Sequence, residues 1–577
     1  MSPAHLLTAA LSVSAVRGGT LSLPHIDYLT ILPELIFLGG ALVMLLHSAL
    51  IRRTMDAATS TSWALSAATA ALVASLVQWY EVSAHGPKVA VAGAVAFDGF
   101  SVFVTILVSS ATLVAILISH SWLEREGVRG PEMQALMLVS AMGAMLMGAA
   151  NDLIMVFLGL EILSIALYVL AAFDHRRPAS GEAALKYFIL GAFSSAVFVY
   201  GIALVYGATG TTNLPQIADF LSRNLLLHNG LLLGGLALLL AGFCFKIAAV
   251  PFHMWTPDVY QGAPTPVTGF MSAIAKVGGF AALLRVFVSS FGLLRADWQP
   301  AIWVIAALTL LLGASVALVQ RDVKRMLAYS SINHAGFVLL GLQAATSRGV
   351  SDSLYYLFAY AFMALGSFAV VSIVGAKGDG NHRLDAYRSL GRRHPWLAAA
   401  FTVFLLGQAG IPFTTGFLAK LAVVEAAVEA HSVWLAGIAM VSAVVAAFFY
   451  LGLVRLMWAA PAADAPVAGA PAGAMASVGA ATASMQPAER VSAGALASPV
   501  GTAAGQVSGS AAGSPAGAGS TSGEEAGSTS EETEEPALST PLGVGIAIAL
   551  CAGVTVVFGV IPAPLLDFAH QATLLIR

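Results

Sequence analysis

The sequence predicts an all-α, polytopic membrane protein with about fourteen transmembrane helices. Of its 577 residues, 58% are hydrophobic and 10% are charged, which is far more apolar than the composition of a soluble domain. Apolar runs of about 20 residues, the length that crosses the hydrocarbon core of a bilayer, recur along the chain. The formal net charge of −3, with no basic runs carrying interleaved aromatic residues, argues against nucleic-acid binding.

The apolar runs, read in order, divide the chain into a three-helix segment (29–131), two five-helix blocks (132–291 and 298–459) and a last span with its tail (541–577). Each run is separated from the next by Gly, Pro or charged residues. The candidate spans cover residues 29–50, 62–80, 99–120, 132–149, 151–173, 183–208, 229–256, 264–291, 298–320, 324–346, 353–376, 395–430, 433–459 and 541–561.

Two segments lie outside these spans. Residues 1–28 are interpreted as a disordered or interfacial N-terminal lead-in; a cleaved signal peptide is the alternative, disfavoured because no Lys or Arg precedes LLTAALSVSAV. Ala, Gly, Ser, Pro and Thr dominate residues 461–540, a composition that cannot bury a core and predicts a disordered cytoplasmic linker. Its acidic end, EEAGSTSEETEEP, leaves docking to a basic partner as the alternative.

The basic residues support this count of spans and orient the chain. Lys and Arg accumulate in cytoplasmic loops, and alternate loops must lie on the same side of the membrane. We therefore predict both termini on the outer side, which is the periplasm if this is a bacterial inner-membrane protein. The basic residues in loops after odd-numbered spans are Arg52, Arg53, Arg125, Arg129, Arg176, Arg177, Arg321, Lys324, Arg325, Lys377, Arg383, Arg388, Arg392 and Arg393.

The two five-helix blocks form a weak internal repeat. Each block has a plain span, a span with an ionisable group, a span rich in Gly and aromatic residues, and a span interrupted by Pro. VPF at 250–252 matches IPF at 411–413. Because five is odd, the second block must be inverted in the membrane. Inverted repeats with discontinuous helices are typical of ion-coupled transporters, which place ion sites near the breaks.

Four ionisable residues lie deep inside spans, where a charge costs at least about 2.5 kcal/mol on insertion scales. Because Pro251 and Pro412 interrupt two of these spans, freed backbone groups and water are expected beside the charges. A carboxylate that moves or takes up a proton would switch a nearby buried Lys between holding and releasing a proton. The pattern predicts a proton relay of side chains. The four residues are Glu161, Lys246, Lys276 and Lys420.

Other ionisable residues allow both functional and structural interpretations. His253 follows a Pro break and His334 lies within a span, where an imidazole can relay a proton or only satisfy hydrogen bonds. Lys186 lies a few residues inside its span and can instead snorkel to the interface or bind lipid phosphate. Asp98 begins a span, so it is interpreted as a helix-start residue or an interfacial group. Arg285, near a span end, is interpreted as snorkelling.

The segment FKIAAVPFHMWTPDVYQGAPTPVTGFMSAIAKVGGFAALLR, at 245–285, closely resembles a signature of the antiporter-like membrane subunits of respiratory complex I, the proton-translocating NADH-quinone oxidoreductase. VPFHMWTPDVY followed by GAPTPVT is similar to the subunit N group rather than to subunits L and M. LKYFILGAFSSAVFVYGIALVYGATGT and AGIPFTTGFLAK are similar to further stretches of that group. The resemblance covers about residues 29–459 and the last helix, and the 461–540 insert departs from it.

This resemblance implies a fourteen-helix subunit with two inverted five-helix repeats, in a complex that pumps protons as electrons pass from NADH to quinone. It implies that Glu161 and Lys246 form the coupled pair of the first half-channel. It also implies that Lys276 connects the two halves and that Lys420 serves the second half-channel, toward the outside.

The same resemblance implies that His253 and His334 relay protons or organise water, and that Lys186 tunes the Glu161–Lys246 pair. The sequence has no recognisable nucleotide, flavin or iron–sulfur motif, and its two Cys residues are interpreted as packing residues. NADH, FMN, iron–sulfur clusters and quinone are therefore expected in partner subunits. The alternatives are a subunit of a multisubunit cation/proton antiporter or of a related membrane-bound hydrogenase complex.

Overall fold

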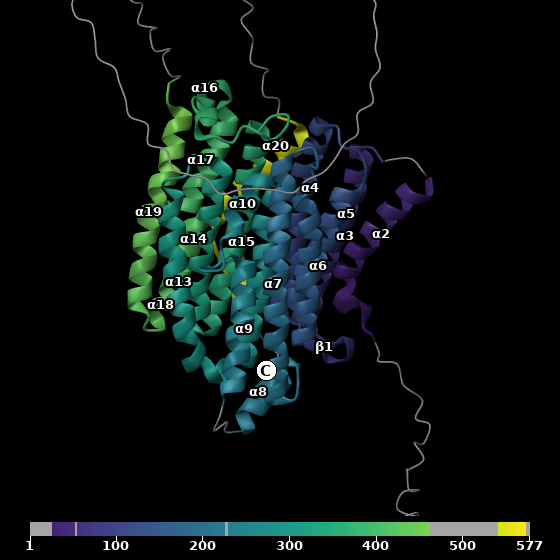
Figure 1. The fold of residues 1–577 in the computed structure, drawn as a ribbon, viewed down its shortest axis with the longest axis vertical. Helices are drawn as coiled ribbons and strands as arrows, with labels where there is room; N and C mark the ends of the chain where they lie inside the picture. The colour runs from purple at the N-terminus through teal and green to yellow at the C-terminus, as the bar shows by residue number, and fades with distance from the viewer. Residues whose placement is uncertain (1–25, 52–54, 225–228, 461–539, 573–577) are drawn as a thin grey trace, which may run out of the picture. The chain divides into compact units, whose positions relative to one another are not determined.

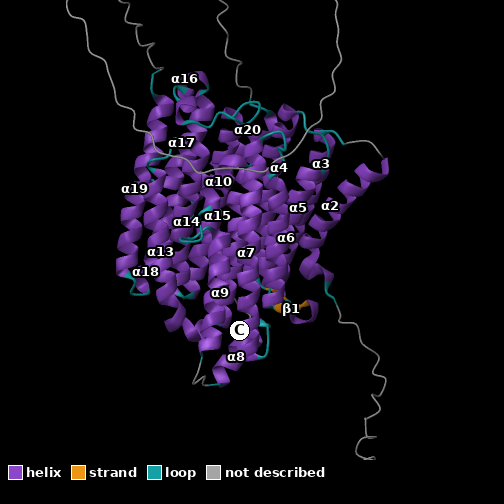
Figure 2. Cartoon of the chain, in the orientation of Figure 1, coloured by secondary structure: helices purple, strands orange, loops and turns teal. Residues whose placement is uncertain are grey.

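A computed structural model describes residues 26–51, 55–224, 229–460 and 540–572, which form a bundle of helices (Figure 1 and Figure 2). Within these residues, twelve helices are long and apolar enough to cross a membrane. The remaining two expected spans, 324–346 and 395–430, correspond to a more polar helix and a broken helix. All but the last residue of the predicted linker at 461–540, and residues 1–25 of the lead-in, lie outside the described residues.

The three-helix segment begins at the short 3-10 helix η1. A two-stranded antiparallel hairpin connects its second and third helices, and each strand has only three residues. Asp98 is the N-cap of the third helix, where its Oδ1 accepts the N–H of Ser101 at 2.8 Å, as a helix-start residue should. The elements are η1 (Tyr28–Ile31), α2 (Leu32–Ile51), α3 (Ala57–His85), β1 (Lys88–Ala90), η2 (Val91–Gly93), β2 (Val95–Phe97) and α4 (Gly99–Glu126).

The first five-helix block contains a broken helix, α9–α10, and a last span that passes through two π-helical segments, η3 and η4. The short amphipathic helix α8 lies between α7 and α9. The elements are α5 (Glu132–Ala149), α6 (Leu153–Ala171), α7 (Pro178–Thr209), α8 (Leu214–Arg223), α9 (Gly230–Ile247), α10 (Trp255–Gly262), α11 (Thr265–Phe270), η3 (Met271–Ala275), α12 (Lys276–Leu284) and η4 (Arg285–Ser290).

The second block has the same order of helices, with its break between α17 and α18, and the last span is followed by a short terminal helix. The elements are η5 (Gly292–Leu294), α13 (Arg295–Ala317), α14 (Val323–Ala344), α15 (Ser347–Val374), η6 (Leu384–Tyr387), α16 (Leu390–Arg393), α17 (Pro395–Ala409), α18 (Thr415–Glu429), α19 (Val433–Trp458), α20 (Leu542–Val560) and α21 (Ala563–Gln571).

Both helix breaks use the same backbone geometry. At the end of α9, Ala248 has a φ of 61° and the N–H of Ala249 bonds the carbonyl of Cys244 at 2.8 Å. At the end of α17, Gly410 has a φ of 86° and the N–H of Ile411 bonds the carbonyl of Leu406 at 3.0 Å. Such 6→1 bonds around a left-handed residue close a helix, and the Pro that follows cannot continue it. The expected span at 229–256 therefore extends to Gly262, because the break lies within it.

The loops meet at two opposite ends of the bundle according to their parity. An isolated β-bridge between Asp152 and Asn213 joins the turn after α5 to the loop after α7. A second bridge, between Asp322 and Arg383, joins the turn after α13 to the loop after α15. We call the end that carries the loops after α4, α6, α13 and α15 the Arg-rich end, and the end that carries β1, β2 and α8 the hairpin end (Figure 1). This division matches the alternation used to count the spans.

Arg285 does not snorkel, so the sequence interpretation of this residue was wrong. Its Nη1 and Nη2 donate to the two carboxylate oxygens of Asp98 at 2.9 and 2.8 Å, and its Nε donates to the carbonyl of Gly148 at 2.8 Å. The side chains of Arg285 and Asp98 are 4% and 0% exposed. This bidentate pair fastens the end of the first block to the start of α4, which keeps the Arg inside the protein rather than at the lipid interface.

Candidate functional site

Glu161 lies on α6 and Lys246 near the end of α9, and each is bound to a serine. Ser195 of α7 donates a short hydrogen bond to Oε1 of Glu161, and Nζ of Lys246 donates to Oγ of Ser164 at 2.8 Å. Ser164 follows Glu161 by three residues, so both acceptors lie on α6 about one turn apart. Both serines and Lys246 line a cavity of about 10 Å³, roughly the room for one water molecule. The described residues contain no direct ion pair between Glu161 and Lys246.

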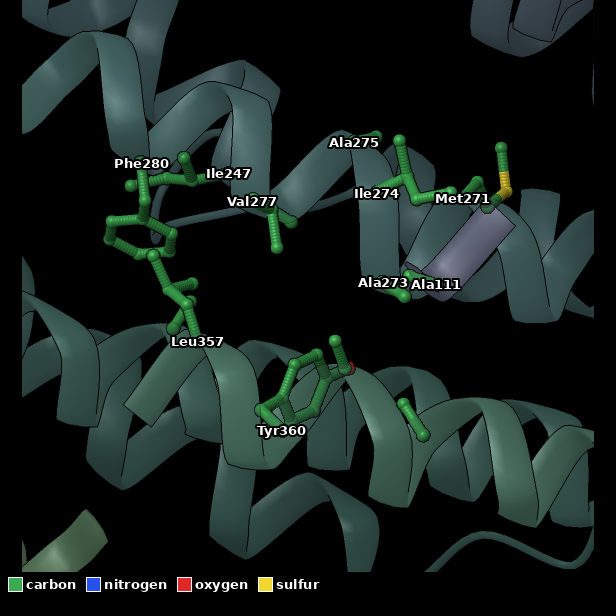
Figure 3. Close-up of a cluster of buried hydrophobic side chains, with 14 of the residues drawn as sticks. Ala111, Ile247, Met271, Ala273, Ile274, Ala275, Val277, Phe280, Leu357 and Tyr360 are labelled. Atoms are coloured by element: carbon green, nitrogen blue, oxygen red, sulfur yellow. The ribbon is translucent and has the colours of Figure 1, made fainter. Parts of the chain in front are cut away.

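Lys276 is buried where a π-helical segment gives way to α12. Its Nζ donates to both the carbonyl and the Oγ of Ser331, the latter at 2.7 Å. The hydroxyl of Tyr360 also donates to this Oγ at 2.8 Å, and the Tyr360 ring centroid lies 5.1 Å from the ammonium. Figure 3 shows the apolar neighbours of Lys276 on the same helix, among them Ile274 and Val277, across from Tyr360. The ammonium is thus desolvated but hydrogen-bonded, and stabilised by a cation–π contact.

His334 and Lys420 belong to a second hydrogen-bonded group. Nδ1 of His334 bonds the hydroxyl of Tyr356 at 2.7 Å, and its Nε2 bonds the hydroxyl of Tyr450 at 3.2 Å. The Tyr450 hydroxyl donates in turn to Oε1 of Gln408 at 3.4 Å. Nζ of Lys420 donates to the carbonyls of Gln408 and Ala409, at 2.8 and 2.9 Å. Those carbonyls lie at the end of α17, where the break leaves them without a helical partner.

The structure therefore brings Lys276, His334 and Lys420 into one polar region. The ring centroids of His334 and Tyr360 lie 4.9 Å apart. This ring contact places the hydrogen-bonded group of Lys276 next to that of His334 and Lys420. Most of the intervening groups were not identified from the sequence. Two sequence patterns could have indicated some of them. Polar residues recur at helical spacing in SSINH of α14 and in YYLFAY of α15. The missed residues are Ser330, Ser331, Tyr356, Tyr360, Gln408 and Tyr450.

Lys186 lies apart from this region, near the Arg-rich end. Its Nζ bonds Glu182 at 2.8 Å and Asp258 at 3.0 Å, and Asp258 is also bound by Arg325 at 2.6 Å. These four residues line a polar cavity of about 410 Å³. Along α7, Lys186 is nine residues from Ser195, a separation of about 13 Å. The structure therefore shows no contact between Lys186 and the Glu161 region.

His253 lies in the break between α9 and α10 and is 8% exposed. Within the described part of the chain, its Nδ1 has no hydrogen-bond partner. The structure does not join this ring to Lys246 or Lys276. Its buried, unpartnered nitrogen fits a water-binding position better than a direct link between two lysines.

Asp379, in the loop after α15, is a fully buried carboxylate that the sequence analysis missed. It accepts the N–H and hydroxyl of Thr265 at 2.8 and 2.6 Å, and Lys324 lies 3.6 Å away. Lys324 donates to the carbonyl of Ala263 at 2.6 Å. Together they satisfy the backbone groups left free where the two prolines of GAPTPVT separate α10 from α11. Burial alone would raise the pKa of Asp379, but Lys324, His382 and Thr265 hold it well below its usual range.

We expect Asp379→Asn to destabilise the protein by about 3 kcal/mol at neutral pH, because it leaves Lys324 buried without its counter-ion. The folded-state pKa of Asp379 lies below the unfolded value of about 3.9, so its contribution is present above that pH and is lost as the pH falls below it. In thermal unfolding of the purified complex, the variant should have a lower Tm than the wild type at neutral pH. This difference in Tm should become smaller toward acid pH. Asp385→Asn, an exposed Asp in the same loop, is the matched control. A difference in Tm independent of pH would contradict this role.

Known proteins resemble the chain in sequence over most of its length. The family model NADH:quinone oxidoreductase/Mrp antiporter, TM, matches residues 150–446. NADH-quinone oxidoreductase subunit N of Rhodococcus opacus is 42% identical over 496 residues, covering 78% of this chain and 91% of that protein. The subunit N of Trichlorobacter lovleyi is 46% identical over 367 residues, covering 64% of this chain and 75% of that protein.

Solved structures resemble the chain over most of its length. A chain of respiratory complex I from Thermus thermophilus with bound aureothin has a TM-score of 0.69 at 28% identity, covering 93% of this chain and 98% of its own. A chain of the Mrp complex from Dietzia has a TM-score of 0.71 at 18% identity, covering 94% of this chain and 96% of its own, and shows a shared fold alone.

Proposed function

Because the chain belongs to the subunit N family of antiporter-like membrane subunits in the proton-pumping NADH-quinone oxidoreductase, we propose that its buried Lys, Glu and His groups carry the pumped protons. The observation that carries this proposal is the polar region from Lys276 through His334 to Lys420, which crosses between the two five-helix blocks. Electron transfer from NADH to quinone belongs to the complex, and its cofactors are proposed to reside in other subunits.

The relay works by moving charge between groups that cannot all be charged together. Like charges repel strongly in a low-dielectric interior, so a proton arriving on one buried Lys or His favours release from the next. Hydroxyls of Ser331, Tyr360 and Tyr450 both donate and accept, so they can pass a proton without holding a charge. In the first half-channel, Glu161 would control Lys246 through Ser164, Ser195 and the small cavity between them.

A partner membrane subunit is proposed to cover the outer face of α6. Glu161 is only half-buried and lies in a stripe of exposed apolar residues on this helix. A carboxylate facing lipid near the middle of a bilayer is costly, whereas a protein neighbour can supply polar partners or water. The stripe consists of Ile154, Leu158, Ile165 and Val169.

The orientation and internal symmetry remain our proposals. We place the Arg-rich end in the cytoplasm because it holds most loop Lys and Arg residues, with both termini on the periplasmic side of a bacterial inner membrane. We take residues 132–291 and 298–459 as inverted repeats, because the β-bridges Asp152–Asn213 and Asp322–Arg383 are matching features at opposite ends of the bundle. Residues 461–540 are proposed to be a linker without chemistry.

Lys246→Ala and Glu161→Gln test the proposed function. Each should lower NADH-driven proton pumping at least about tenfold in membrane vesicles, since a positioned proton-transfer group contributes about 10²-fold or more. Immunoblots should show that the variant complexes assemble, and Lys377→Ala, an exposed Lys at the Arg-rich end, should pump normally. Unchanged pumping in assembled Lys246→Ala complexes would remove Lys246 from the relay. Cation-dependent proton exchange by the chain alone, without flavin and iron–sulfur partners, would instead favour the antiporter alternative.

A further inference from the structure

Three oxygen-bearing side chains lie along one face of α15 at intervals of four residues. Tyr360 bonds Ser331, the partner of Lys276, and Tyr356 bonds His334. Asp352 is the third, one turn closer to the start of the helix at the hairpin end. Each interval of four residues rises about 6 Å, and side chains so spaced lie above one another. We call Tyr360, Tyr356 and Asp352 the α15 ladder.

Asp352 occupies an unusual environment for a carboxylate. Its side chain is 3% exposed, and no described residue donates a hydrogen bond to its Oδ2. The nearest basic groups, Nε of Arg348 and Nε2 of His570, lie 3.6 and 3.7 Å from its two oxygens. A buried carboxylate with so few bonds is costly unless it holds a proton for part of the time or binds water. Asp352 lies at the end of the α15 ladder, where a carboxyl group that takes up and releases a proton could serve proton transfer.

The groups beyond Asp352 are solvated. Arg348 binds Glu425 at 2.6 Å and also binds Glu429, and both Glu side chains are at least half exposed. His570, on the terminal helix α21, is 51% exposed. Phe568 anchors α21 by packing against Trp79 and Phe103, with ring centroids 4.4 and 4.6 Å apart. Asp352 therefore lies between the buried ladder and a solvated cluster at the hairpin end.

We propose that Tyr356, Asp352 and His570 form a proton exit branch that leaves the relay at His334. This inference rests on the proposed function. A proton on Nδ1 of His334 passes to the Tyr356 oxygen as the Tyr356 hydroxyl proton moves, directly or through one water, to the Asp352 carboxylate. Asp352 then passes that proton to His570, which releases it to solvent at the hairpin end. One proton enters at His334, one leaves at His570, and no group changes its net charge after the cycle.

The Tyr450–Gln408–Lys420 route is the other branch, reached from Nε2 of the same imidazole. His334 is thus the point where the two branches separate. Lys420 retains its proposed role on that second branch, where it lies on α18 beside the end of α17.

The test measures NADH-driven proton pumping and NADH oxidation by the whole complex in membrane vesicles. Asp352→Asn should lower pumping about tenfold, and Asp352→Glu, which restores a titratable carboxyl, should recover most of it. Tyr356→Phe removes only one hydroxyl and should lower pumping several-fold. Asp297→Asn, an exposed carboxylate at the same end of the bundle, is the control and should pump normally.

The outcomes separate this inference from the proposed function. Normal pumping by Asp352→Asn, beside impaired pumping by Lys276→Ala, overturns the exit branch and leaves the relay standing. Normal pumping by both overturns the relay itself. Equal loss in Asp352→Glu and Asp352→Asn indicates a packing role and also overturns the inference. If Asp352→Asn does not assemble, Tyr356→Phe decides, because wild-type pumping in that variant is incompatible with the branch.

Discussion

Complexes with Lys276→Ala are expected to lose NADH-driven proton pumping at least about tenfold while still inserting in the membrane. The ammonium of Lys276 is the group that reaches Ser331, and no other described cation bonds that serine. Without this ammonium, the two halves of the proposed relay would have no titratable connection. Proton uptake by a pH-sensitive dye in inverted vesicles, alongside NADH oxidation, measures the effect.

Two further substitutions separate charge from volume. Lys276→Met keeps the apolar stem without the charge, so it should resemble Lys276→Ala. Lys276→Arg keeps a charge, so it should be milder than alanine, although Arg gives up little of its proton. Equal pumping by the wild-type, Arg and Ala complexes would exclude Lys276 from the path.

Arg285→Met is expected to destabilise the subunit by about 3–5 kcal/mol, because it leaves the Asp98 carboxylate buried without its counter-ion. The amount of assembled complex in membranes and its thermal stability in detergent should both fall. The double variant Asp98→Asn with Arg285→Met should recover part of the loss, since a buried ion pair replaced on both sides leaves no unpaired charge. Arg295→Met, an exposed Arg at the same end, is the control and should assemble normally. A stable single variant would mean that the pair contributes little.

Most of the fold could be predicted because lipid imposes a simple rule of length and apolarity. Every expected span has a helix, and the alternation of loop charge agrees with the contacts between loops. The hairpin β1–β2, the ten-residue helix α8 and the nine-residue helix α21 were not predicted. These elements are much shorter than the apolar runs that indicate a span, so hydropathy does not detect them. Tertiary contacts decide whether such short elements form.

Only the ionisable members of the candidate site could be predicted. A Lys or Glu inside an apolar run is conspicuous because its cost is large, which is why Lys276 and Lys420 could be singled out. A Ser or Tyr side chain adds little to the free energy of inserting a helix in the membrane. The cost of insertion therefore does not mark out Ser331, Tyr356 and Tyr450. Whether they matter depends on which helix faces which, and Asp379 shows the same limit, because its partner Thr265 is 114 residues away.

The two β-bridges, at Asp152–Asn213 and Asp322–Arg383, have a consequence for how the chain evolved. Their hydrogen bonds are made by main-chain groups, which nearly every amino acid supplies. If the two halves descend from one duplicated ancestor, these β-bridges would have tolerated almost any substitution. The side chains of the two copies could then diverge while the backbone geometry was kept. Selection could then give one half Glu161 with Lys246 and the other half Lys420. Duplicated architecture with separately specialised chemistry is the expected result, and it accounts for a repeat that is visible in helix order but weak in identity.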